Sequence, residues 1–140
     1  MKEKYLIPIP VGMPPDIRPA PFHKTDACLR HCIDFALPPG TPILASRDGI
    51  VIVRESRFSK NFTNTEDVDK GNGVILRHAD GEISVYAHVQ WRSVRVARGE
   101  FVRQGQEIAK SGQTGYATYP HLHFGIYDKG GRNRKVHFGR

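Results

Sequence analysis

The sequence predicts an all-β domain in which antiparallel hairpins predominate. From residue 33 onward, short runs of β-branched and aromatic residues are separated by Gly, Pro and Asp, which is typical of strands joined by tight turns. No window has the apolar spacing of an amphipathic helix. Two stretches, "PPGTPILASRDGIVI" and "ARGEFVRQGQEIAKSGQTG", also repeat one order of glycine turn, short apolar strand, glycine turn and second strand.

The N-terminal 22 residues differ from the rest, because they hold many of the prolines and show no clear periodicity. We expect them to form an extended arm that lies on the domain. The first strands are predicted at Ile43–Ala45 and Gly49–Glu55, in a region marked by Pro and Gly. The polar stretch that follows, residues 56–72, is too long for a simple turn, so it is either a wall or lid of a functional groove or a plain surface excursion.

The next two predicted strands, Gly73–Arg77 and Ile83–Val89, flank a short polar connection. Within it, Ala79, Asp80 and Gly81 are expected to form a tight hairpin turn, because Asp and Gly tolerate the positive φ that such turns require. The remaining strands are predicted at Ser93–Val96, Glu107–Ser111 and His121–Tyr127.

The repeated glycine pattern is the signature of a hammerhead-like half-barrel, in which glycines make sharp corners and alternate apolar residues fill the interior. We therefore expect an antiparallel barrel-sandwich hybrid, similar to a duplicated hybrid motif, with long loops around a groove. The second copy alone would also fit a biotin or lipoyl carrier, which displays its lysine at a hairpin tip. Lys110, however, lies between Ala109 and Ser111 in an expected strand, which weakens the carrier interpretation.

The length of 140 residues allows one hydrophobic core, so we expect one domain at 23–128, preceded by the arm at 1–22 and followed by a basic tail at 129–140. No apolar run approaches the ~20 residues that cross a bilayer. Prolines interrupt the apolar N-terminus, so no signal peptide is expected in this chain. The net charge of +7 favours polyanionic partners. No aromatic and basic strand motif points to nucleic acid among them.

Cys28 and Cys32 are the only cysteines. Together with His31 they could be part of a zinc knuckle, but no second Cys/His pair lies nearby to complete four ligands. A local disulfide and a pair of buried thiols are both open interpretations.

Two histidines stand two residues apart in "YPHLHF". Because side chains alternate along a strand, His121 and His123 are expected on one face, about 6 to 7 Å apart, where they could share a metal and its water. The alternative is one exposed histidine and one hydrogen-bonded core histidine. His88 closes another predicted strand, and Asp34 is a carboxylate inside the apolar run "CIDFALP", where an unpaired charge would be costly. This set suits a catalytic zinc with one position left for water.

Three segments resemble, in this order, the lysostaphin-type or LytM-type zinc endopeptidases, which cut the peptide cross-links of bacterial peptidoglycan. The segments are "IDFALPPGTPILASRDGIVI", "GNGVILRHADGEISVYAHV" and "VRQGQEIAKSGQTGYATYPHLHF". An ordered set of motifs is far more specific than any one of them. The resemblance implies that Asp34 and His123 are zinc ligands and that His88 and His121 are catalytic.

The chain departs from the family pattern at the first zinc ligand. The family usually has a histidine four residues before the aspartate, and that position is Arg30 here. Two candidates are His31 and His23. His31 is three residues before Asp34, so in a regular strand the two side chains would point to opposite faces unless a bulge intervenes. A hairpin could fold His23 back beside the carboxylate, and family members with an insertion here are similar, so we favour His23.

The resemblance therefore implies one Zn²⁺ per chain, held by His23, Asp34 and His123, with His88 and His121 acting on the water and the oxyanion. It also implies peptidoglycan cross-link peptides as the substrate, in the cell envelope or outside the cell. The stretch "SGQTGYATYP" would line a trough for the peptide. Two alternatives are a non-catalytic member of the same fold that binds the cell wall and regulates another hydrolase, and a biotin- or lipoyl-like carrier.

Overall fold

The computed structural model describes residues 4–18, 29–59, 61–62, 71–117 and 119–139, and these residues form strands and loops without a helix. The strands are β1 (Ile17–Arg18), β2 (Ile33–Ala36), β3 (Pro42–Leu44), β4 (Gly49–Glu55), β5 (Asn61–Phe62), β6 (Gly73–Arg77), β7 (Ile83–Ala87), β8 (Phe101–Val102), β9 (Glu107–Lys110), β10 (Gly115–Tyr116), β11 (His121–Tyr127) and β12 (Asn133–Arg134). Accordingly, this part of the chain contains no helix long and apolar enough to span a membrane.

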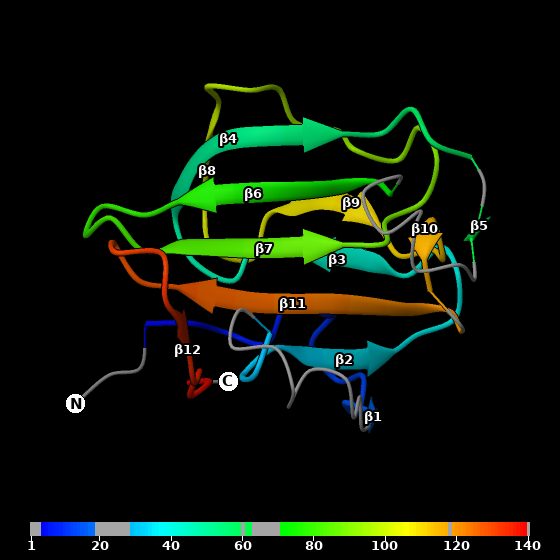
Figure 1. Cartoon of the computed structure of the whole chain (residues 1–140), viewed down its shortest axis with the longest axis horizontal. Helices are drawn as coiled ribbons and strands as arrows, with labels where there is room; N and C mark the ends of the chain where they lie inside the picture. Colours follow the sequence, from blue (N-terminus) through cyan, green and yellow to red (C-terminus); the bar gives the residue numbers. More distant parts are fainter. Residues whose placement is uncertain (1–3, 19–28, 60, 63–70, 118, 140) are drawn as a thin grey trace.

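One large sheet dominates the molecule, with the strand order β1-β2-β11-β7-β6-β4-β8 and with β12 paired to β11 (Figure 1). The small antiparallel sheet of β3 and β9 lies behind it (Figure 1). A third pair, β5 with β10, is parallel. The predicted all-β, antiparallel fold is confirmed, and β5 with β10 is its one parallel exception among the described strands.

The prediction of a strand at Ser93–Val96 is wrong. The backbone groups of Val94 and Val96 form hydrogen bonds with side chains of other segments rather than with a neighbouring strand. The amide of Val94 donates to Oγ of Ser56 at 3.2 Å, and the guanidinium of Arg54 donates to the carbonyls of Val94 and Val96 at 3.0 and 3.3 Å. An extended segment can thus satisfy its polar groups without joining a sheet.

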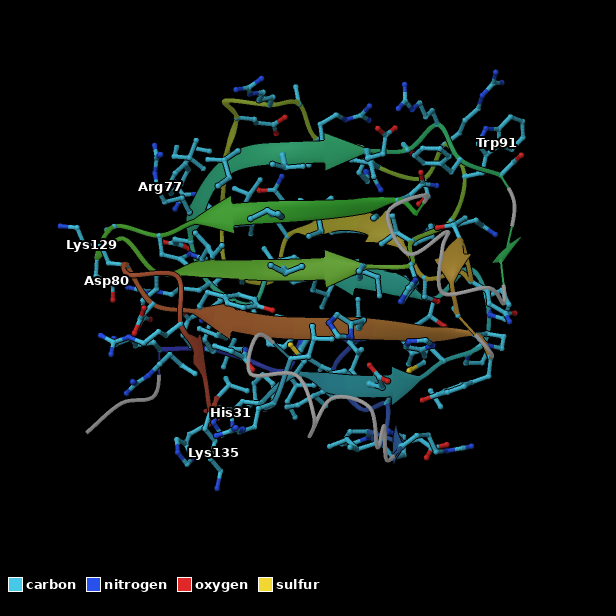
Figure 2. The ribbon with its side chains drawn as sticks, in the orientation of Figure 1. His31, Arg77, Asp80, Trp91, Lys129 and Lys135 are labelled. Carbon is cyan, nitrogen blue, oxygen red and sulfur yellow. The ribbon has the colours of Figure 1, made fainter. Side chains whose placement is uncertain are left out.

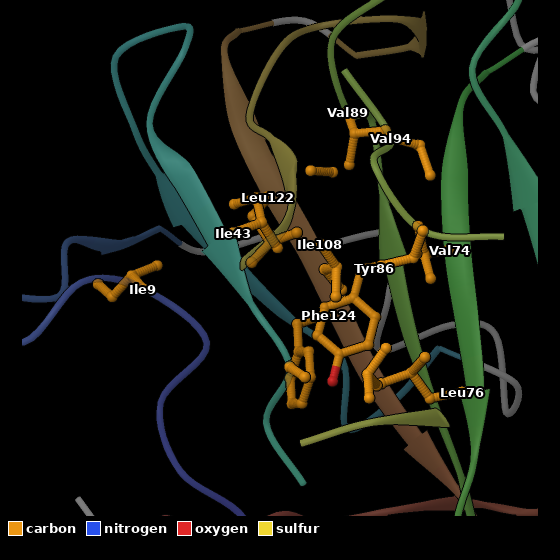
Figure 3. Close-up of a cluster of buried hydrophobic side chains, with 14 of the residues drawn as sticks. Ile9, Ile43, Val74, Leu76, Tyr86, Val89, Val94, Ile108, Leu122 and Phe124 are labelled. Atoms are coloured by element: carbon orange, nitrogen blue, oxygen red, sulfur yellow. The ribbon is translucent and has the colours of Figure 1, made fainter. Parts of the chain in front are cut away.

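The hydrophobic core lies between the large sheet and the small one (Figure 3). Leu122 and Phe124 of β11 point into it and are fully buried, as are Ile43 and Ile108 from the small sheet. Each fully buried side chain of this size stabilises the fold by about 1.5 to 3 kcal/mol. Tyr86 is also fully buried, and its hydroxyl accepts hydrogen bonds from Ser46 and Ser84.

The same alternation places the other half of β11 on the outer face of the large sheet. His121 and His123 lie on this outer face, because they alternate along β11 with Leu122 and Phe124, which point into the core. In the register of the sheet, His123 is the direct partner of Asp34 on β2 and of Ala87 on β7. One rung of the sheet therefore carries a carboxylate and an imidazole side by side.

Both ends of the described chain pack on the domain. Tyr5 and Ile9 of the N-terminal segment are buried in the core, and Phe138 packs against it. The hydroxyl of Tyr5 donates a hydrogen bond to Glu82 at 2.8 Å, and Arg47 forms an ion pair with the same glutamate at 3.3 Å. The division of the chain at residues 22 and 128 stays a prediction.

Candidate metal centre

Asp34 and His123 form the middle of the candidate site. They face one another across β2 and β11, and Nδ1 of His123 lies 3.0 Å from Oδ1 of Asp34. Only 5% of Asp34 is exposed to solvent. A carboxylate this deeply buried requires a positive or hydrogen-bonding partner. The structure thus brings together Asp34 and His123, the two expected metal ligands that lie among the described residues.

The donor chemistry of this pair fits zinc. In the metal-free protein, burial lowers the pKa of His123, but hydrogen bonds with Asp34 and Cys32 outweigh burial and raise it to about 9. At neutral pH the imidazole of the metal-free protein is therefore protonated and donates a hydrogen bond to the carboxylate. A divalent cation would take the place of that proton, because carboxylate oxygen and imidazole nitrogen are both zinc ligands.

The third ligand expected from the sequence, His23, lies outside the described residues. His31 lies in the turn before β2, where its backbone N–H donates to Oδ1 of Asn133 at 2.6 Å. Figure 2 shows His31 on the side of the molecule where β12 lies. Over the described ranges, no group of three His, Cys, Asp or Glu side chains is arranged to hold a metal. In the structure His31 is therefore not grouped with Asp34 and His123, and the first ligand, His23 in preference to His31, stays a prediction.

His121 lies beside the pair, and its Nε2 is 3.7 Å from Oδ1 of Asp34. Its Nδ1 lies 2.8 Å from the carbonyl oxygen of Tyr119. A carbonyl only accepts hydrogen bonds, so Nδ1 carries the hydrogen, and Nε2 of the neutral ring keeps its lone pair. Burial lowers the pKa of His121, which favours this neutral form at pH 7.

His88 reaches the site directly after β7, which ends at Ala87, two residues before the predicted end at Val89. Its φ of 68° is in the left-handed region, which ends the strand at Ala87. The ring lies 4.7 Å from that of His121 and 6.1 Å from that of His123, between centroids. Nδ1 donates to the carbonyl of Thr114 at 2.7 Å. Burial lowers the pKa of His88 to about 4, and repulsion between the two rings when His121 is protonated lowers it further, so Nε2 of His88 is also a free acceptor at neutral pH.

Two residues that lie at the site were not predicted to belong to it. Cys32 is a free cysteine whose sulfur lies 3.6 Å from the hydroxyl of Tyr127. Its position two residues before Asp34, on the same face of the strand, was the available signal. Cys28 lies outside the described residues. Tyr119 stacks on His121, with ring centroids 4.6 Å apart and planes 30° apart. Burial and the charge of Asp34 raise the pKa of its phenol, so it stays protonated.

The family model named Peptidase family M23 matches residues 29–135, which is most of the chain and includes this site. This chain belongs to peptidase family M23. The resemblance predicted from the three sequence segments is thereby confirmed. The matched range contains Asp34, His88, His121 and His123, the four described residues of the candidate site.

Curated M23 relatives are much longer than this chain. Peptidoglycan DD-endopeptidase ShyC of Vibrio cholerae is 43% identical over 91 residues, which is 65% of this chain and 18% of the relative. The chain spans about a fifth of the length of the curated relatives that it matches.

Solved structures share the fold over almost the whole chain. A zinc containing peptidase from Vibrio cholerae is 25% identical, with a TM-score of 0.69, over 98% of this chain and 41% of that one. The catalytic domain of lysostaphin from Staphylococcus simulans is 26% identical, with a TM-score of 0.61, over 96% of this chain and 87% of that domain. A structure of the SpoIIQ–SpoIIIAH pore forming complex is 25% identical, with a TM-score of 0.70, over 96% of this chain and 89% of that one.

Proposed function

We propose that this M23 chain is a zinc-dependent endopeptidase that hydrolyses peptide cross-links of bacterial peptidoglycan. The observation that carries the proposal is the buried Asp34–His123 pair with two neutral histidines beside it. A cation site flanked by two free imidazole acceptors has the parts that hydrolysis of an amide requires: a seat for a Lewis acid and a base for water.

The residues would divide the work as follows. Asp34 and His123 would hold Zn²⁺ with His23, and the bound ion would lower the pKa of a water and polarise the scissile carbonyl. His121 and His88 each keep a lone pair on Nε2, so they can orient the attacking water and accept its proton. Once protonated, such an imidazole donates a hydrogen bond to the oxyanion and returns the proton to the leaving amine.

The substrate class rests on the relatives and on charge. ShyC carries the name of a peptidoglycan DD-endopeptidase, and lysostaphin is described as an antimicrobial peptidase. The net charge of +7 would assist approach to an anionic cell wall, an effect that added salt screens. We accordingly propose that the chain acts in the cell envelope or outside the cell.

The proposal is tested by measuring zinc content together with digestion of defined cross-linked muropeptides, followed by mass spectrometry of the products. His123→Ala is expected to abolish both zinc binding and cleavage. His121→Ala is expected to keep the zinc while lowering turnover by roughly 10² to 10⁴, the usual contribution of a positioned proton-transfer group. His137→Ala, which replaces an exposed histidine near the C-terminus, is the matched control and is expected to change neither quantity.

The same assay tests the third ligand. His23→Ala is expected to lose zinc, whereas His31→Ala is expected to retain it, because His31 lies outside the Asp34–His123 pair. A folded wild-type protein that takes up no zinc and cleaves no muropeptide would contradict the proposal.

A second candidate is a non-catalytic member of the fold that binds the cell wall and regulates another hydrolase. It is favoured by the likeness to a structure of the SpoIIQ–SpoIIIAH pore forming complex. Absence of zinc in the purified protein would support it. The carrier alternative gains no support, because Lys110 lies within β9 and forms an ion pair with Glu107 at 2.9 Å.

A further inference from the structure

The backbone of His88 is strained. Its φ of 68° is in the left-handed region, which a residue with a Cβ atom adopts only at a cost in energy. Residues in this region keep their conformation where the surrounding structure fixes them, and they gather at functional sites. The groups that hold His88 in this conformation therefore also determine where its imidazole lies.

Two buried polar residues hold the backbone on both sides of His88. The carbonyl oxygen of Asn72 accepts hydrogen bonds from the backbone N–H groups of His88 and Val89, at 3.0 and 3.3 Å. The carbonyl oxygen of Val89 in turn accepts from the hydroxyl of Thr114 at 2.7 Å. Asn72 is 2% and Thr114 is 6% exposed, so water competes little for these contacts.

The hydroxyl of Thr114 joins these contacts into one network. Besides donating to Val89, its oxygen accepts a hydrogen bond from the backbone N–H of Asn72 at 3.1 Å. Both the hydrogen and a lone pair of the hydroxyl are thus used within the protein. A single side chain therefore ties residue 114, directly before β10, to residue 72 before β6 and to residue 89 after β7.

The backbone carbonyl of Thr114 acts on the imidazole itself. Nδ1 of His88 donates a hydrogen bond to this oxygen at 2.7 Å. Because a carbonyl oxygen only accepts, the contact keeps the hydrogen of the neutral ring on Nδ1 and leaves the lone pair on Nε2. If the carbonyl moved, the ring could turn and its hydrogen could occupy either nitrogen.

We propose that Thr114 is a positioning residue for His88. Its hydroxyl fixes its own carbonyl oxygen, and that oxygen selects the tautomer and the orientation in which the imidazole can accept a proton from water. The inference rests on the proposed peptidase function. The effect of Thr114 on hydrolysis is exerted through His88.

Thr114→Val tests the hydroxyl, because it removes this group and keeps the shape of the side chain. With the zinc-loaded protein and a defined muropeptide, kcat is expected to fall roughly 10- to 100-fold, since a small misplacement of a catalytic group causes a loss of this size. KM is expected to stay within about twofold. Thr114→Ser restores the hydroxyl and is expected to recover kcat to within about threefold of the wild type, since only a methyl group is missing.

Thr41→Val is the matched control. Thr41 is buried to a similar degree, with 7% exposed, and its hydroxyl donates to the carbonyl oxygen of Pro38 at 2.6 Å, outside the network around His88. Both valine variants are expected to have a lower Tm, because each loses a buried hydrogen bond. Only Thr114→Val is expected to lose kcat, when all the proteins are assayed well below their Tm.

Nitrogen NMR of the imidazole supplies a readout that depends neither on activity nor on zinc. The chemical shifts of the two ring nitrogens distinguish the two neutral tautomers from one another. In the full chain at neutral pH, before and after zinc is added, His88 is expected to carry its hydrogen on Nδ1. In Thr114→Val a second population with the hydrogen on Nε2 is expected.

Three results would overturn the positioning role. They are a wild-type His88 with its hydrogen on Nε2, an unchanged kcat in Thr114→Val, and a kcat in Thr41→Val that falls as much as in Thr114→Val, which would mean that reduced stability alone is the cause. The wild-type spectrum decides even if Thr114→Val does not fold. If the wild-type chain cleaves no muropeptide, the peptidase function fails instead, and the tautomer of His88 still tests the contact with Thr114.

Discussion

Gly125 lacks a side chain at the point where β11 passes under the sulfur of Cys32. A Cβ atom built on Gly125 would lie 2.5 Å from that sulfur, closer than non-bonded atoms approach. Cys32 also contributes a hydrogen bond to the side chain of His123. The pair therefore sets the spacing between β2 and β11 beside the candidate metal ligands.

Gly125→Ala is expected to destabilise the fold by about 1 to 3 kcal/mol, because an extra methyl group must displace a sulfur held on the neighbouring strand. Urea unfolding in the presence of a chelator measures this without a contribution from metal. The double variant Cys32→Ala, Gly125→Ala is expected to be more stable than Gly125→Ala alone. Equal instability of the two proteins would show that the contact with the sulfur is not the cause.

Among the elements, β4 supports the segment at residues 93–96 through Arg54 rather than through its backbone. Arg54→Lys is expected to cost about 1 kcal/mol, because an ammonium cannot reproduce the planar fork that binds the carbonyls of Val94 and Val96. Amide hydrogen exchange in this segment should accelerate in the variant. Arg77→Lys, an exposed arginine on β6, is the control, and an equal effect there would exclude the specific role of Arg54.

The sequence predicts the structure of some elements better than that of others. Period-two alternation correctly placed His121 and His123 on one face, because β11 is a long regular strand with core residues between them. Alternation failed at Ser93–Val96, where side chains satisfy both backbone groups of Val94 and a single backbone hydrogen bond, from Arg95 to Ile108, reaches β9. The stacking of Tyr119 on His121 depends on the turn before β11, and strand periodicity says nothing about turns.

At the scale of the whole molecule, the N-terminal segment is part of the core. Ile9 is 3% exposed, whereas Val11, two residues later, is 92% exposed. Ile9→Ala is expected to destabilise the protein by about 2 to 5 kcal/mol through the cavity it leaves. Val11→Ala is expected to change stability by less than about 0.5 kcal/mol. Thermal or urea unfolding checks both, and equal effects would show that the segment is not packed as described.

The rung that pairs residue 34 with residue 123 joins positions 89 residues apart in the chain. A metal ion bound by both residues would cross-link these two distant positions. Closing a loop of this length removes much of the conformational freedom of the unfolded polypeptide. The ion would then secure the outer strands β1 and β2 to the rest of the sheet. A single atom could in this way serve both reactivity and architecture.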